Sequence, residues 1–218
     1  YGKTTDLTAM GGAQYVHTFD KCFFMPSDLT AGLEYNRDRL KDNMWGYNRH
    51  TDQTVNIYSA FLQNEWKNDR WGILIGGRLD KHNMVDNVIF SPRANLRFNP
   101  TQNINLRLSY SSGFRAPQAF DEDMHIENVG GTVAMIERAK DLKEEKSQSF
   151  SVSADMYHRF GAFQTNLLIE GFYTRLTDVF VLGKPYDRGD GILVKTRSNG
   201  PGAKVMGLTL EGKVAYLS

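Results

Sequence analysis

The sequence has little of three things that define common classes of protein: cysteine, long apolar runs and an excess of charge of one sign. Its 218 residues contain one cysteine, Cys22, so no internal disulfide can form. No run approaches the ~20 apolar residues that a membrane-spanning helix needs. With 26 Lys and Arg against 25 Asp and Glu, the net charge is +1. A disulfide scaffold and a helical membrane protein are excluded, and we expect no nucleic-acid partner.

What the sequence does contain is a regular alternation of apolar and polar residues. From Phe90 to Phe98 every second side chain is apolar, and the pattern restarts at Ile104 after the turn residues Asn99 to Thr101. A transmembrane strand needs only ~9–11 residues of this kind. Strands are predicted at residues 5–18, 28–40, 53–66, 70–80, 88–99, 103–116, 146–160, 163–180, 191–198 and 204–217.

The connectors between these strands alternate in length along the chain. Short connectors fall near Asp20 and at 67–69, 100–102, 160–162 and 199–202, and long ones at 41–52, 81–87, 116–145 and 182–190. Outer-membrane barrels have short periplasmic turns and longer extracellular loops, whereas a soluble sandwich gives no reason for this alternation. The sequence therefore predicts an all-β fold, an antiparallel up-and-down transmembrane β-barrel.

Charges and aromatic residues occupy the positions that such a barrel would give them. The polar faces of the strands carry Arg93, Arg97, Arg107, Asp155 and Glu170, which suit a wet lumen better than a packed core. Aromatic residues near strand ends suit interfacial girdles, although hairpin packing would also explain them; they are Trp66, Trp71, Tyr110, Phe114 and Phe160.

One strand end resembles a motif of TonB-dependent outer-membrane receptors. That family has a GFRAP-like box at the end of a strand, matched here by Gly113, Phe114, Arg115, Ala116 and Pro117. A second box, NPxLKPEKS-like in the family, is matched loosely by residues 141–147, with Ala139-Lys140-Asp141 where Asn-Pro-Asp is typical. Residues 199–211 are similar to a further family stretch in the expected order.

The resemblance implies a 22-strand barrel with an N-terminal plug domain, of which residues 1–218 supply about ten strands. It also implies a receptor in the outer membrane of a Gram-negative bacterium, in contact with lipid. The cargo would be a small molecule such as an iron chelate, haem or a corrinoid, imported with energy from a TonB-type protein that contacts a segment not in this chain. We expect the plug and terminal strands, and any targeting segment, to lie outside the sequence that begins at Tyr1.

The long connector 116–145 holds the first candidate ligand residues. Asp121, Asp123 and His125 lie close together in it, beside Glu122. In haem-uptake members of the resembled family a histidine between the two boxes binds haem iron, and His125 stands in that interval. The alternatives are a histidine that is solvated or paired with Asp121 or Asp123, and a divalent cation bound by the carboxylates. No resident cofactor is expected, since haem or an iron chelate would be cargo.

The connector 41–52 holds the second set of candidate ligand residues. Trp45, Tyr47 and Arg49 mix aromatic and basic character, which suits an aromatic or anionic chelate. Packing between neighbouring loops would explain the same residues.

Two other functional classes remain as alternatives to transport. A soluble β-rich binding module would share the strand alternation but not the alternating connectors. An outer-membrane barrel hydrolase would draw acid and base groups from Asp121, Asp123 and His125. No serine has a nucleophile elbow around it, and Gly76-Gly77 and Gly130-Gly131 lack the spacing of a nucleotide fingerprint. We therefore expect no enzymatic activity.

Overall fold

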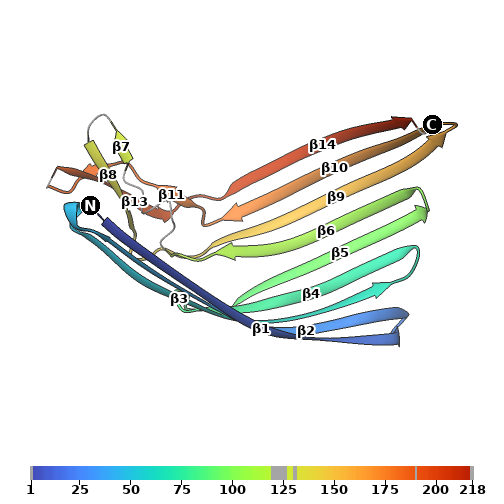
Figure 1. Cartoon of the computed structure of the whole chain (residues 1–218), viewed down its shortest axis with the longest axis horizontal. Helices are drawn as coiled ribbons and strands as arrows, with labels where there is room; N and C mark the ends of the chain where they lie inside the picture. Colours follow the sequence, from blue (N-terminus) through green and yellow to red (C-terminus); the bar gives the residue numbers. More distant parts are fainter. Residues whose placement is uncertain (1, 119–126, 130–131, 190, 217–218) are drawn as a thin grey trace.

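A nine-stranded antiparallel sheet makes up most of the protein (Figure 1). A computed structural model describes residues 2–118, 127–129, 132–189 and 191–216. The sheet contains, in spatial order, β1 (Gly2–Cys22), β2 (Met25–Met44), β3 (Arg49–Lys67), β4 (Trp71–His82), β5 (Ile89–Thr101), β6 (Ile104–Arg115), β9 (Glu145–Phe160), β10 (Phe163–Thr177) and β14 (Ala203–Tyr216). β1 and β14 are its two edges, so the sheet forms an open trough.

Helix is nearly absent from the described residues. The 3-10 turn η1 (Trp45–Tyr47) joins β2 to β3. Within the described part of the chain, no helix is long and apolar enough to cross a membrane.

The predicted all-β fold with antiparallel strands is confirmed, and nine of the ten predicted strands lie in this sheet. Every one has at least the ~9–11 residues needed to cross a bilayer, from 12 residues in β4 to 21 in β1. β1 to β3 are longer than their neighbours and extend to the left in Figure 1, past the point where β4 and β5 are joined.

The predicted strand at 191–198 is not part of the large sheet, and that part of the prediction was wrong. β10 pairs directly with β14 from Phe163↔Tyr216 to Leu176↔Ala203, so residues 178–202 form one long connector. The strand within it, β13 (Ile192–Asn199), has 8 residues and is too short to cross a bilayer. The short connector predicted at 199–202 therefore lies at the same end as the long connectors.

A second sheet is built from the two longest connectors. Its order is β11 (Phe180–Leu182), β13, β8 (Thr132–Arg138) and β7 (Glu127–Val129), with β12 (Tyr186–Asp187) also paired to β13. β13 and β8 pair in parallel, which joins the connector after β6 to the connector after β10. This sheet lies at the long-connector end of the molecule, on the left in Figure 1.

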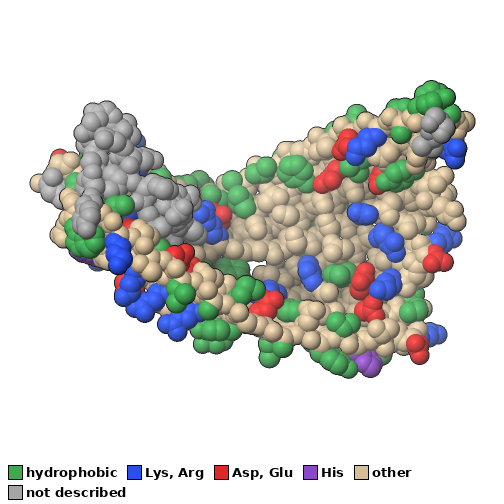
Figure 2. Space-filling model, viewed as in Figure 1, with side chains coloured by type: hydrophobic (Ala, Val, Ile, Leu, Met, Phe, Trp, Pro, Cys, Tyr) green, Lys and Arg blue, Asp and Glu red, His purple; other side chains and the backbone are tan. Residues whose placement is uncertain are grey.

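The large sheet has one polar and one apolar face. Cross-strand partners point to the same side, so the registers Ser109↔Ser151 and Leu108↔Val152 assign alternate residues to opposite faces. Figure 2 looks into the hollowed face, where charged side chains lie among polar ones and hydrophobic side chains gather toward the rim. On the convex face large apolar side chains are exposed: Leu108 is 52%, Val152 58% and Leu208 77% exposed.

The described residues bury little apolar core beneath the large sheet. Only seven hydrophobic residues among them are buried, and three of these, Val85, Ile89 and Ala116, form one cluster near the long connectors. An apolar face left open beside a polar hollow is the arrangement of a wall with hydrocarbon outside and water inside. The soluble-module alternative does not explain this face.

Aromatic pairs border the convex apolar face at both ends. At the short-turn end Trp66 stacks on Phe24 with centroids 5.7 Å apart, and Trp71 stacks on Phe98 at 4.2 Å. Near the other end Tyr110 contacts Phe150 at 4.8 Å. These aromatic pairs lie where interfacial girdles are expected. Phe160 and Phe163, which flank the turn between β9 and β10, also lie at such a position. Phe114 differs, because it packs against the cluster of Val85, Ile89 and Ala116.

An arginine placed on either face tests this assignment. Val152 lies on the convex face in the middle of β9 (Glu145–Phe160), and Ser151 lies on the concave face of the same strand. We expect Val152→Arg to lower the free energy of unfolding by about 2–4 kcal/mol, the cost of a charge at the bilayer midplane. The matched change Ser151→Arg should cost much less, since its side chain enters the wet hollow. Denaturant titration of the receptor in lipid vesicles measures both, and equal costs would contradict the assignment.

Candidate ligand-binding site

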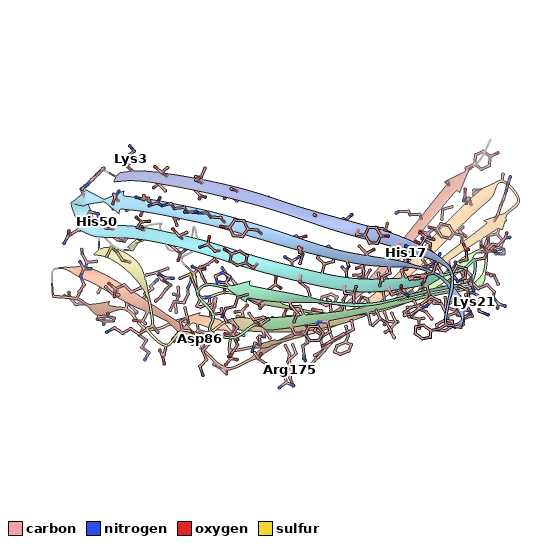
Figure 3. The ribbon with its side chains drawn as sticks, turned by 90° about the horizontal axis from the view of Figure 1, so that it is seen from below. Lys3, His17, Lys21, His50, Asp86 and Arg175 are labelled. Carbon is pink, nitrogen blue, oxygen red and sulfur yellow. The ribbon has the colours of Figure 1, made fainter. Side chains whose placement is uncertain are left out.

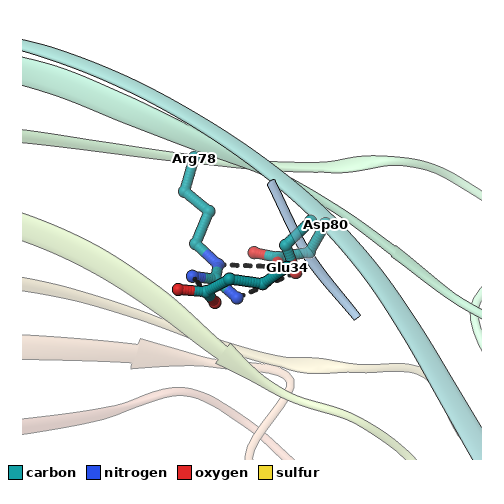
Figure 4. A network of polar contacts seen from close by, with 4 residues as sticks. Glu34, Arg78 and Asp80 are labelled. Atoms are coloured by element: carbon teal, nitrogen blue, oxygen red, sulfur yellow. Dashed lines mark hydrogen bonds and ion pairs between the residues drawn. The ribbon is translucent and has the colours of Figure 1, made fainter. Parts of the chain in front are cut away.

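A network of charged side chains spans β2, β3 and β4 on the concave face (Figure 4). Arg78 lies at its centre, with its Nη1 2.6 Å from Glu34 Oε2 and its Nε 2.8 Å from Asp80 Oδ1. Its Nη2 donates to Ser59 Oγ at 2.8 Å, and Ser59 Oγ donates to Asp80 Oδ1 at 2.6 Å. Every nitrogen of Arg78 is thus engaged. The network cross-links the wall and leaves no charge of Arg78 free for a ligand.

Among the described cations of the concave face, Arg93 remains available to a ligand. It lies opposite Gly76 on β4 and Ser111 on β6. Together with Ser111, Gln63 and Ser91 it lines a hollow of about 480 Å³. Among the described residues Arg93 makes no hydrogen bond or ion pair. Gln63 lies in the same cross-strand row. Its Oε1 is buried, and no described residue donates a hydrogen bond to it. A guanidinium beside amide and hydroxyl groups is suited to an anionic ligand group.

A second hollow of about 400 Å³ lies nearer the short turns. Arg97 and Arg107 face each other there across β5 and β6, with Glu65 and Glu170 in the same lining. Arg97 donates to the backbone oxygen of Asn68 at 3.2 Å, and Arg107 donates to Asn105 Oδ1 at 2.7 Å. These arginines are therefore tied to the wall, unlike Arg93.

The GFRAP box connects the wall to the long connectors. Ala116 belongs to the buried cluster and Phe114 packs against it, while Arg115 lies over the ring of Phe180, 5.7 Å from its centroid. Pro117 accepts a hydrogen bond through its carbonyl from Arg138 Nη1 at 3.0 Å, and the same nitrogen donates to Gln53 Oε1 at 3.0 Å. Gly113 has space for a Cβ 3.4 Å from Ser147 Oγ. The box therefore fixes the base of the connector 116–144 rather than offering groups to a ligand.

His82 ends β4 beyond the apolar band and holds the start of the same connector. The residue is 1% exposed. Its Nδ1 accepts from the backbone N–H of Met84 at 3.0 Å, so Nε2 carries the proton and donates to Gln118 Oε1 at 3.3 Å. Burial lowers the pKa of His82 below its ordinary value, and the bond to Gln118 and the charge of Asp80 oppose that shift. The neutral imidazole is thus the form that fits this contact.

The residues of connector 41–52 lie at the tip of the hairpin between β2 and β3. Trp45 is 49% exposed in η1. Arg49 forms an ion pair with the buried Asp42 at 2.8 Å, which holds the hairpin together. Tyr47 lies in the same turn, and its side chain is outside the described part of the structure. The structure brings Trp45 and Arg49 to one hairpin, and their contact with a ligand stays a prediction.

Asp121, Asp123 and His125 lie outside the described residues, so their arrangement stays a prediction. The part of the chain that the structure describes contains no group of three metal-ligating side chains. The Arg78 network, the availability of Arg93 and the His82 contact were all missed by sequence reasoning. The sequence does place these polar and charged residues at the alternate strand positions that face the lumen. Only the pairing register of the strands shows which of them come into contact.

The fold and the polar hollow define a class: a wall of an outer-membrane receptor barrel. The model of the TonB-dependent receptor-like β-barrel matches residues 1–217, and the chain belongs to this family. It is accordingly a protein of the outer membrane of Gram-negative bacteria. The family consists of receptors rather than enzymes, in agreement with the expectation of no catalytic activity.

Similar proteins include iron-uptake receptors. The siderophore receptor PirA of Pseudomonas aeruginosa superposes with a TM-score of 0.74 at 17% identity, over 97% of this chain and 39% of that one. The FrpB iron transporter of Neisseria meningitidis gives a TM-score of 0.67 at 17% identity, over 99% and 34%. A probable hemoglobin and hemoglobin-haptoglobin-binding protein of Haemophilus influenzae is 23% identical over 206 residues, 92% of this chain and 18% of that protein. The chain thus spans less than half the length of these proteins.

Mild acid tests the His82 contact. Because the pKa of His82 is lower in the folded state, its contribution to stability is complete above pH ~6.5 and declines as the pH falls from there toward the lowered folded pKa. We expect the Met84 amide to exchange hydrogen faster in mild acid than at neutral pH, after correction for intrinsic exchange. His82→Gln should remove this pH dependence, whereas His158→Gln, at the opposite end of the sheet, should retain it. A pH response unchanged in His82→Gln would contradict the assignment.

Proposed function

We propose that this chain forms part of the wall of a receptor that imports an iron chelate or haem across the outer membrane, in a process energised through a TonB-type protein. The proposal depends on one observation. The wall has a lipid-compatible convex face, and on its concave face Arg93 has no ion-pair or hydrogen-bond partner among the described residues. Iron-bearing siderophores and haem present anionic oxygen groups, which match a guanidinium. The cargo is a transported ligand, and no resident cofactor is invoked.

The relatives support iron as the element and leave the form of the cargo open. The structural neighbours are described as receptors for siderophores and as an iron transporter, while the curated relative is described as binding hemoglobin. Their identities to this chain are low, so the choice between a siderophore and haem depends on this chain's own residues. Arg93 suits either cargo, whereas His125 would favour haem.

Uptake and binding together test the proposal. We expect a strain that lacks the receptor to grow poorly on its iron source, and growth to require the proton-motive force. The purified receptor should bind at least one member of a panel of haem, ferric catecholates and ferric hydroxamates. Arg93→Gln should weaken binding of an anionic member about tenfold, because a charge-assisted hydrogen bond contributes ~1.5–3 kcal/mol. Tryptophan fluorescence quenching measures the affinities.

The control for Arg93 is Arg159→Gln, which removes the same charge at the short-turn end, where Arg159 donates to the backbone of Gly161. Its affinities should equal those of the unmodified receptor. If Arg93→Gln binds as tightly as the control, the role of Arg93 is wrong. If the receptor binds no member of the panel and its loss leaves growth unchanged, iron uptake itself is wrong.

Haem and siderophore cargo are distinguished at His125. If haem is the cargo and His125 an axial ligand, His125→Ala should shift the haem Soret band of the loaded receptor and weaken haem binding. His50→Ala, in the neighbouring connector, is the matched histidine control and should leave the spectrum unchanged. An unaltered spectrum in His125→Ala would reject haem ligation by this residue.

A further inference from the structure

Two basic side chains face each other on the convex side of the sheet, at the end that carries the long connectors. Arg175 on β10 lies directly opposite Lys204 on β14, and both are exposed. Figure 3 shows Arg175 projecting outward from the sheet. The described residues provide no ion pair or hydrogen bond to either side chain. Lys146, one row further out, is already paired with Glu144 at 3.0 Å.

Like charges at directly opposed positions destabilise an antiparallel pair. Nothing described around Arg175 and Lys204 offsets this: their row continues with Gln148 on β9 and Ser112 on β6. An anion placed between the two cations would remove the repulsion. The pair is therefore suited to a ligand that carries negative charge.

The height of the pair on the wall indicates which kind of anion it would meet. The next row toward the bilayer contains Tyr110, Phe150, Tyr173 and Met206, the aromatic border of the apolar face. Residues just beyond such a border lie among lipid head groups. Basic residues at that level attract anionic lipid.

An apolar groove runs from this border down the convex face. In the row Leu108, Val152, Gly171 and Leu208, the glycine leaves a gap in an otherwise apolar surface. The open groove around it has a volume of about 610 Å³ and is lined largely by apolar atoms. A groove of this kind beneath two cations has the form of a site for a lipid, with an acyl chain below a charged head group.

We propose that the convex face of β9, β10 and β14 binds one phosphorylated lipid of the outer leaflet. Arg175 and Lys204 hold a phosphate of the head group, and an acyl chain occupies the groove at Gly171. This site lies on the opposite side of the wall from the proposed cargo site, so either assignment can fail without the other.

The test uses the whole receptor in detergent, titrated with lipopolysaccharide and, separately, with the same lipid after its phosphates have been removed. Native mass spectrometry measures the bound lipid. We expect the phosphorylated lipid to bind, and Arg175→Gln/Lys204→Gln to weaken it about tenfold or more, since each basic residue near a membrane surface contributes ~1 kcal/mol. Lys21→Gln/Lys213→Gln removes the same charge at the short-turn end and should not change binding.

A second variant tests the groove without altering charge. A Cβ at Gly171 would lie 3.8 Å from Val152 Cγ1 and 3.9 Å from Leu208 Cδ1, so a larger side chain is accommodated on this face. Gly171→Leu should fill the gap and weaken binding of the acylated lipid. Inorganic phosphate alone should not compete, because it lacks the chain.

Three outcomes would overturn the proposal. The first is equal binding of the phosphorylated and dephosphorylated lipids. The second is equal loss of binding in the Arg175/Lys204 variant and its control, which would indicate annular lipid only. The third is full competition by inorganic phosphate, which would indicate an anion site without a lipid.

Discussion

The structure depends on one constraint: in hydrocarbon every backbone N–H and C=O must find a partner within the protein, while successive side chains of a strand meet opposite surroundings. An antiparallel sheet satisfies the first requirement through its hydrogen bonds. Period-two alternation satisfies the second, as in β9, where Val152 faces outward and the hydroxyl of Ser151 lies 2.5 Å from that of Ser109. With few buried apolar residues described beneath the sheet, the surrounding lipid takes the place of a protein core.

The same alternation decides where the charges lie. Because the convex face excludes charge over the height of the bilayer, Arg78, Glu34 and Asp80 must share the concave face, where they cross-link three strands. Arg93 lies in that hollow without a described partner, and a wet hollow lowers the cost of keeping it so. Arg175 and Lys204 lie on the convex face only where the apolar band has ended. Each cationic position is thus set by its height and by its side of the wall.

The sequence was sufficient to predict strands and faces, because both follow from a period of two along one segment. It placed β6 and β9 closely and assigned Leu108 and Ser109 to opposite sides. It could not predict which residues meet across strands, because Glu34 and Arg78 are far apart in sequence and approach only through the register of β2, β3 and β4. The strand at 191–198 was misplaced because alternation is common to membrane strands and to short strands in loops. Only its length, 8 residues, distinguishes it.

The wall and the connectors have different freedom to vary. A wall residue is constrained by its register, its face and its height, so a change of ligand cannot easily be made there. The connectors are free of the bilayer, yet they are not independent: β8 and β13 pair in parallel, and Arg138 links Pro117 to Gln53 on β3. The GFRAP box, through Phe114 and Arg115, ties this joined unit to the wall. Specific recognition of a ligand is therefore best placed in the connectors, which the box holds at a fixed position above the polar hollow.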